Sequence, residues 1–240
     1  MNRVKLAYNA SLVLLAAFAA TVVCPIVLLA IGASPLATYT TIFTGPFQDL
    51  FGISEILVRA VPLILVALGI AISFRSGIIN IGAEGQIMVG ILASTATALA
   101  FPHLPKAVLL PMMLLAGVVG GGLWAGIAGI LRAKLGVNEI LSTVMLNYIA
   151  AQFYTYLLRG PMIDPGELET GSGTPQSLRL PVEAWLSRLV PGTRLHTGLI
   201  LALVLAVGVY FLLWRTTWGY RMRAAGAEPK AARYAGIHVE

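Results

Sequence analysis

Six long apolar stretches run through the sequence of 240 residues, and they constrain its fold more than any other feature. Each approaches the roughly 20 apolar residues that a helix needs to cross a bilayer. Charged residues make up 11% of the chain, against about 25% in soluble domains, which argues against a water-soluble enzyme. The sequence predicts an all-α, polytopic integral membrane bundle, a single transmembrane domain over residues 1–240. About six spans are expected: 10–31, 56–74, 86–101, 107–131, 140–158 and 197–214.

Lys and Arg outnumber Asp and Glu by 16 to 10, and this excess is unevenly distributed among the loops. If the N-terminus is cytoplasmic, most of the basic side chains lie inside, at positions 3–5, 75, 132–134 and 215–233. The positive-inside rule therefore predicts a cytoplasmic N-terminus, an extracytoplasmic loop over 159–196 and a cytoplasmic segment over 216–240. This topology explains the positive net charge without a nucleic-acid partner, and membrane lipid is the expected contact.

Arg59 is a charged residue inside the second span, where ionisable side chains are functional by default. It lies about one turn from the outer end of the span, and Glu55 precedes it by four residues on the same helix face. A snorkelling arginine paired with Glu55 is favoured over a substrate ligand.

The apolar pattern breaks near residues 76–86, where three glycines accompany Asn80, Glu84 and Gln86. Irregular backbone at membrane depth is tolerated only where it is buried in protein or lines a wet cavity. One interpretation is a broken helix beside a central pathway. The other is a glycine-rich cytoplasmic turn with Glu84 solvated in the first turn of the next helix, and composition does not separate the two.

The fifth span begins with Asn138, a good helix N-cap, and Glu139, whose charge suits the positive end of a helix. Glu139, Thr143 and Asn147 recur every fourth residue and so share one helix face. This face can line a pathway or form hydrogen bonds with a neighbouring helix.

The fourth span contains two Gly-x-x-x-Gly spacings, Gly117 with Gly121 and Gly122 with Gly126. Small residues at this spacing let two helices approach closely in a membrane. We expect packing rather than chemistry here.

The expected outer loop contains the segment 182–190, which has the pattern of a short amphipathic helix with Trp185 at the level of the lipid headgroups. Docking of an extracytoplasmic partner and a cap resting on the membrane both fit it. His103 and His196 stand alone, so no metal site is expected.

The C-terminal segment predicts two short helices joined at Glu228, because Gly226 can end one and Pro229 can begin the next. The resulting elbow is rich in alanine and glycine and edged with arginine. It can approach a partner's groove closely, or it can rest as a basic helix on anionic lipid.

Three motifs together resemble those of ABC transporter permeases, in particular the nucleoside or simple-sugar importers, which are related to branched-chain amino-acid and ribose permeases. They are residues 77–86 (Gly-Ile-Ile-Asn-Ile-Gly-Ala-Glu-Gly-Gln), 138–148 (Asn-Glu-Ile-Leu-Ser-Thr-Val-Met-Leu-Asn-Tyr) and 223–237 (Arg-Ala-Ala-Gly-Ala-Glu-Pro-Lys-Ala-Ala-Arg-Tyr-Ala-Gly-Ile). The resemblance implies a bacterial inner-membrane protein. It implies a second permease, an external substrate-binding protein and a cytoplasmic ATPase as partners.

The same resemblance assigns roles to two groups of residues. The residues expected to border the substrate pathway are Asn80, Glu84, Gln86, Thr143 and Asn147. The residues expected to dock the ATPase are Arg223, Gly226, Glu228, Pro229, Ala232 and Gly236. Members of the family continue into further helices beyond this segment, so the chain, which ends at Glu240, is expected to be truncated.

No Gly-x-x-x-x-Gly-Lys-Ser/Thr loop is present, so ATP is expected to be bound and hydrolysed on a separate subunit. No cofactor and no catalytic residue are expected in this chain, since the sequence also lacks the common hydrolase and metalloprotease patterns. An ion-coupled secondary transporter and a non-transporting membrane subunit remain as alternatives.

Overall fold

The computed structural model describes residues 3–171 and 175–237, and within them every regular element is a helix. The predicted all-α class is therefore confirmed. The helices are α1 (Arg3–Ala30), α2 (Pro35–Thr44), η1 (Gly45–Phe47), α3 (Leu50–Arg75), α4 (Ala83–Ala100), α5 (Lys106–Leu135), α6 (Glu139–Arg159), α7 (Pro165–Thr170), η2 (Val182–Ala184), α8 (Gly198–Arg215), α9 (Thr217–Ala227) and α10 (Pro229–Tyr234).

Five helices among the described residues are long and apolar enough to cross a membrane: α1 over Ser11–Ala30, and α3, α4, α5 and α8 over their full lengths. The sixth expected span forms α6, a helix of 21 residues that is less apolar than these five. Every predicted span is thus helical, and α6 differs from the rest in its polarity.

The chain divides into two compact units. One holds residues 1–58 with 190–195, and the other holds residues 59–189 with 196–240. That these units form the single transmembrane domain expected from the sequence stays a prediction.

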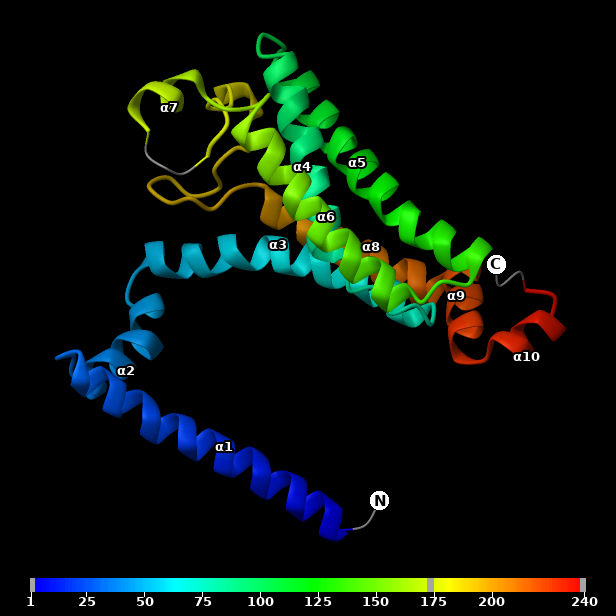
Figure 1. Ribbon diagram of the computed structural model, residues 1–240, viewed down its shortest axis with the longest axis horizontal. Coiled ribbons are helices and arrows are strands. Elements are labelled where there is room, and N and C mark those ends of the chain that lie inside the picture. Colours follow the sequence, from blue (N-terminus) through cyan, green and yellow to red (C-terminus); the bar gives the residue numbers. More distant parts are fainter. Residues whose placement is uncertain (1–2, 172–174, 238–240) are drawn as a thin grey trace. The chain divides into compact units, whose positions relative to one another are not determined.

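In the larger unit α4 packs along α5, and α6 contacts both (Figure 1). Glycine allows the close approach of α4 and α5, because a Cβ on Gly90 or on Gly121 would lie 3.0 Å from a backbone oxygen of the other helix. The predicted packing role of Gly117 and Gly121 is confirmed. Gly122 and Gly126 face open space instead, since a Cβ on either would meet no described atom within 4 Å.

The predicted amphipathic helix over 182–190 is wrong. Only the single turn η2 forms, and Trp185 then turns to an extended conformation. The backbone beyond it pairs elsewhere: the Ser187 carbonyl accepts from the Thr197 amide at 2.9 Å, and Arg188 forms a β-bridge with His196. These tertiary contacts take the backbone groups that a helix would have used.

The predicted Glu55–Arg59 pair is also wrong. The Glu55 carboxylate lies 3.6 Å from Arg194 Nη1, within the smaller unit. Arg59 is exposed, and no ion pair to it occurs among residues 3–171 and 175–237. The sequence spacing did not reveal Arg194, because it is brought to α3 by the loop 190–195.

The predicted elbow is confirmed as two helices, α9 and α10, joined at Glu228; the name elbow is used below for residues 217–234. The Thr216 hydroxyl caps α9 by accepting from the Gly219 amide at 3.1 Å. Helix α9 ends at Ala227, and Pro229 occupies the first position of α10, where its missing N–H costs nothing.

Candidate functional site

The helical pattern breaks between α3 and α4, over residues 76–82, and this segment is called the break. Gly77 has φ +76°, which ends α3 in a conformation that glycine tolerates. Asn80 Oδ1 accepts from the Gly82 amide at 2.8 Å and from Gln86 Nε2 at 3.3 Å, so the break is an ordered turn. Glu84 lies exposed in the first turn of α4.

Asn147 of α6 holds the break through two hydrogen bonds. Its Nδ2 donates to the Ile81 carbonyl at 3.0 Å, and its Oδ1 accepts from the Gly85 amide at 2.9 Å. The Gly85 amide is one of the first N–H groups of α4, which lack partners in their own helix. Asn147 therefore caps α4 from another helix, and the interpretation of its face as hydrogen-bonding is confirmed.

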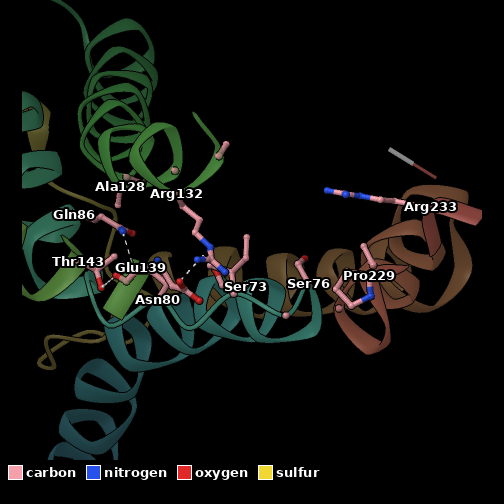
Figure 2. A pocket seen from close by; sticks show the side chains of 17 residues that line it. Ser73, Ser76, Asn80, Gln86, Ala128, Arg132, Glu139, Thr143, Pro229 and Arg233 are labelled. Carbon is pink, nitrogen blue, oxygen red and sulfur yellow. Dashed lines mark hydrogen bonds and ion pairs between the residues drawn. The ribbon is translucent and has the colours of Figure 1, made fainter. Parts of the chain in front are cut away.

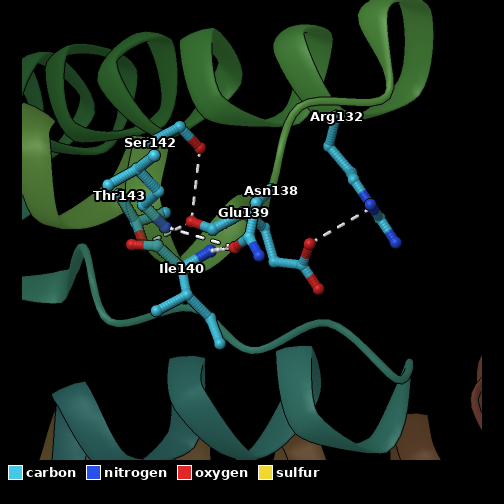
Figure 3. A network of polar contacts seen from close by, with 7 residues as sticks. Arg132, Asn138, Glu139, Ile140, Ser142 and Thr143 are labelled. Carbon is cyan, nitrogen blue, oxygen red and sulfur yellow. Dashed lines mark hydrogen bonds and ion pairs between the residues drawn. The ribbon is translucent and has the colours of Figure 1, made fainter.

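Glu139 and Thr143 lie on the same face of α6 as Asn147. Glu139 pairs with Arg132 at the end of α5, with Oε2 and Nε 3.3 Å apart (Figure 3). Thr143 is buried, donates to the Glu139 carbonyl and contacts the break at Gly82. Glu139, Thr143 and Asn147 thus each contact another part of the chain, either α5 or the break and the start of α4.

Asn138 is the N-cap of α6, as predicted. Its Oδ1 accepts from the amides of Ile140 at 2.9 Å and Leu141 at 3.3 Å (Figure 3). This anchors the helix start beside the Arg132–Glu139 pair.

We expect Asn138→Ala to lower the free energy of unfolding by about 1 kcal/mol, because two helix amides lose their acceptor. Asn138→Ser should retain most of that stability, since a serine hydroxyl also caps. Unfolding of the purified protein in detergent measures both, and equal losses would contradict the capping role.

The elbow meets the break through backbone-to-backbone contact. A Cβ on Gly226 would lie 2.5 Å from the Arg75 carbonyl oxygen and 2.6 Å from the Gly77 nitrogen. A Cβ on Gly77 would lie 2.8 Å from Gly226 Cα. Only a glycine pair fits at this approach, so Gly226 serves a contact within the chain.

Arg223 also turns toward its own chain. Its guanidinium carbon lies 4.3 Å from the Trp214 ring centroid, and that of Arg75 lies 5.4 Å from the same ring. These cation–π contacts tie the end of α3, the end of α8 and α9 together. The side chain of Ala232 is buried as well, whereas Glu228, Pro229 and Gly236 are exposed.

A cavity of 620 Å³, called the elbow cavity, lies where the break, α5, α6 and the elbow meet. Three of the five expected pathway residues line it: Asn80, Gln86 and Thr143. Figure 2 shows these grouped with the Arg132–Glu139 pair, while Pro229 and Arg233 enter from the elbow. Glu84 and Asn147 do not line it.

A second cavity of 740 Å³ lies between α3, α4 and α5, and its lining is mostly aliphatic side chains and glycine. Asn80 and Gln86 line this cavity too. Their amide pair therefore borders both cavities, and the elbow cavity is the more polar of the two.

Two features of this site were missed by the motif analysis. The charge pattern treats Arg132 as a loop residue, whereas the short turn after α5 brings it to Glu139 seven positions later, a spacing visible in the sequence. The Gly77–Gly226 contact had no sequence signal, since it joins glycines far apart in the chain.

Comparison with known families identifies the group to which these helices belong. The model of the branched-chain amino acid transport system / permease component family matches residues 52–240, which include α4 to α10 and nearly all of α3. The chain belongs to this family. As a member of this permease family with several apolar helices, it is a multi-pass membrane protein.

Three curated relatives of the chain are named as ABC transporter permease proteins. It is 39% identical over 234 residues to a glucose ABC transporter permease protein of Haloferax volcanii, covering 93% of this chain and 60% of the relative. It is 35% identical to a guanosine ABC transporter permease protein of Bacillus subtilis over 89% of this chain and 60% of the relative. A nucleoside ABC transporter permease protein of Lactococcus lactis is 34% identical over 90% of this chain and 60% of the relative.

The chain spans about three fifths of the length of these relatives. No solved structure matches it.

Proposed function

We propose that the chain is a permease subunit of an ATP-binding-cassette importer that moves nucleosides or simple sugars across a membrane. The observation that carries the proposal is the backbone contact between the elbow and the break, at Gly226 and Gly77. It joins the elbow, which lies in the cytoplasm in this proposal, to a polar interruption between two apolar helices. The names of the relatives, which include a glucose, a guanosine and a nucleoside permease, support the substrate class.

In this proposal ATP is bound and hydrolysed by separate cytoplasmic subunits, and the permease performs no catalysis. Two permeases form the pathway, and an extracytoplasmic binding protein delivers the solute. The protein lies in a bacterial inner membrane with its N-terminus in the cytoplasm, an orientation supported by the excess of Lys and Arg in the loops on that side.

The elbow offers the ATPase a compact docking surface. Glu228 and Pro229 are exposed, and the Tyr234 side chain at the end of α10 is 95% exposed. A large aromatic side chain this exposed is typical of an anchor that becomes buried in a partner. Ala232, in the same short helix, is buried.

Movement of the docked ATPase reaches the membrane helices through the glycine contact. A shift of α9 displaces Gly77, because the backbones at Gly77 and Gly226 are in direct contact with no side chain between them. The displaced break carries Asn80 and Gln86 with it and pulls on Asn147 of α6. We therefore propose that the main role of four residues is to couple movement of the elbow to the membrane helices. They are Asn80, Gln86, Thr143 and Asn147.

The test is co-purification of a nucleotide-hydrolysing subunit with the permease from native membranes, assayed by ATP hydrolysis. Tyr234→Ala should lose most of the bound ATPase, whereas Tyr210→Ala, an equivalent change on the exposed face of α8, should keep it. Uptake of nucleoside that stops when ATP is depleted, and continues when ion gradients are collapsed, is the expected transport result. Uptake that follows the ion gradient would instead establish a secondary transporter.

A further inference from the structure

Two arginines from different helices converge on one tryptophan, and the group of Arg75, Trp214 and Arg223 is called the arginine–tryptophan cluster. Arg75 ends α3, Trp214 lies one residue before the end of α8, and Arg223 belongs to α9. The guanidinium carbons of Arg75 and Arg223 lie 5.4 Å and 4.3 Å from the centroid of the Trp214 ring. One ring therefore holds two positive charges close together.

The positive charge of this cluster is not neutralised within the described part of the chain. No carboxylate of residues 3–171 and 175–237 forms an ion pair with Arg75 or Arg223. The buried Nε of Arg223 also has no hydrogen-bond partner there. No Asp or Glu occurs from residue 184 to residue 227, although Arg215 and Arg221 add two more positive charges near the cluster in the chain. Like charges repel each other, so an anion from outside the chain would stabilise this arrangement.

The cluster lies at the ends of two apolar helices. Both α3 and α8 are long and apolar enough to cross a membrane, and Arg75 and Trp214 lie in their last turns. Because the two helix ends meet at one ring, they lie on the same side of the membrane. A single residue, Thr216, separates α8 from α9, so Arg223 stays near this level. In a multi-pass membrane protein the end of a span lies among the lipid headgroups.

Exposed aromatic side chains surround this end of α8. Trp214 itself is 45% exposed, Trp218 is 68% exposed and Tyr220 is 62% exposed. Trp and Tyr are enriched where a membrane meets water, because their rings are apolar while their N–H and O–H groups remain hydrated. These side chains favour a ligand that belongs to the membrane over an anion dissolved in water.

The chemistry of the cluster matches a phosphate group. The planar guanidinium of arginine donates two parallel hydrogen bonds to phosphate oxygens, which an ammonium group does not match. Clusters of arginine and lysine directly next to a membrane helix are typical of sites for anionic lipids, which are concentrated in the cytoplasmic leaflet.

We propose that the arginine–tryptophan cluster binds the phosphate of an anionic phospholipid headgroup at the cytoplasmic surface of the membrane. The choice of leaflet rests on the proposed function, which places the elbow in the cytoplasm. Arg75 and Arg223 contact the phosphate, and Trp214 is a positioning residue that holds both guanidinium groups. The bound lipid holds the end of α8 and the start of α9 at the membrane surface.

The experiment measures binding of phosphatidylglycerol and phosphatidylcholine to the purified protein in detergent, by native mass spectrometry. The unmodified protein should bind phosphatidylglycerol at least about tenfold more tightly, because each arginine near an anionic surface contributes about fivefold. The double variant Arg75→Gln, Arg223→Gln should lose this preference. The matched control, Arg59→Gln with Arg188→Gln, removes two exposed arginines elsewhere and should keep it. No preference in the unmodified protein, or an undiminished preference in the first double variant, would overturn the inference.

Conservative variants separate lipid binding from a purely structural role. Arg75→Lys with Arg223→Lys keeps both charges but loses the planar donors, so part of the preference should remain. Trp214→Leu should lower the affinity for phosphatidylglycerol about threefold and leave that for phosphatidylcholine unchanged, since the arginines lose the ring that positions them. Trp214→Phe keeps an aromatic ring and should restore most of the affinity. Equal loss for both lipids in Trp214→Leu would contradict the positioning role.

Competition and co-purification test the other possible ligands. Inorganic phosphate at millimolar concentration should not displace phosphatidylglycerol, and displacement would overturn the lipid proposal in favour of a soluble anion. If the variant Arg75→Gln, Arg223→Gln kept its lipid preference but lost the ATPase, the cluster would belong to the docking surface and the inference would be wrong. The lipid measurement needs neither ATPase nor solute. Absence of ATP-dependent uptake by the unmodified complex would therefore overturn the proposed function and leave the lipid site standing.

Discussion

Gly226→Ala is expected to reduce ATP-driven uptake at least about tenfold while leaving the ATPase bound. The added Cβ would lie 2.5–2.7 Å from backbone atoms of residues 75–77, which have no flexible end that can move aside. The elbow must therefore shift away from the break, and overpacking of this kind costs about 1–3 kcal/mol. Uptake and ATP hydrolysis, measured together in proteoliposomes, should show hydrolysis that no longer drives transport.

The matched control for this change is Gly208→Ala in α8. A Cβ there meets no described atom within 4 Å, so uptake should be unaffected. Normal coupled transport by the Gly226→Ala permease would contradict the role of the glycine contact. Loss of ATPase binding in that variant would instead assign Gly226 to the docking surface.

Asn147→Ala is expected to lower the free energy of unfolding by about 2 kcal/mol and to weaken uptake. The change removes the acceptor for the buried Gly85 amide and the donor to the Ile81 carbonyl. Leaving a buried donor or acceptor without a partner costs about 1–3 kcal/mol. Thermal unfolding in detergent measures the effect.

Two variants make this result specific. Asn147→Asp keeps an acceptor for the Gly85 amide but loses the donor to Ile81, so its stability should fall between the unmodified protein and Asn147→Ala. Thr155→Ala, on an exposed part of α6, should be neutral because Thr155 bonds only to the carbonyl of Ala151 in its own helix. Equal stability of Asn147→Ala and the unmodified protein would refute the capping of α4 by α6.

The candidate site was predicted in part. Asn80, Gln86 and Thr143 do line one cavity, and residues 223–237 do form the elbow. The sequence could not tell that Asn147 turns to the break, since its partners are 62 and 66 residues away. The sequence also could not tell that Gly226 contacts the break and that Arg223 contacts Trp214, because a motif does not reveal which distant segment packs against it.

The sequence by itself determined the apolar helices, the cap at Asn138 and the helix start at Pro229, because each depends on residues within a turn or two. Tertiary structure decided the partner of Glu55, the largely non-helical conformation of 182–190 and the glycine contact. Each of these depends on which distant segment approaches. That approach is set by the packing of whole helices, which local composition does not encode.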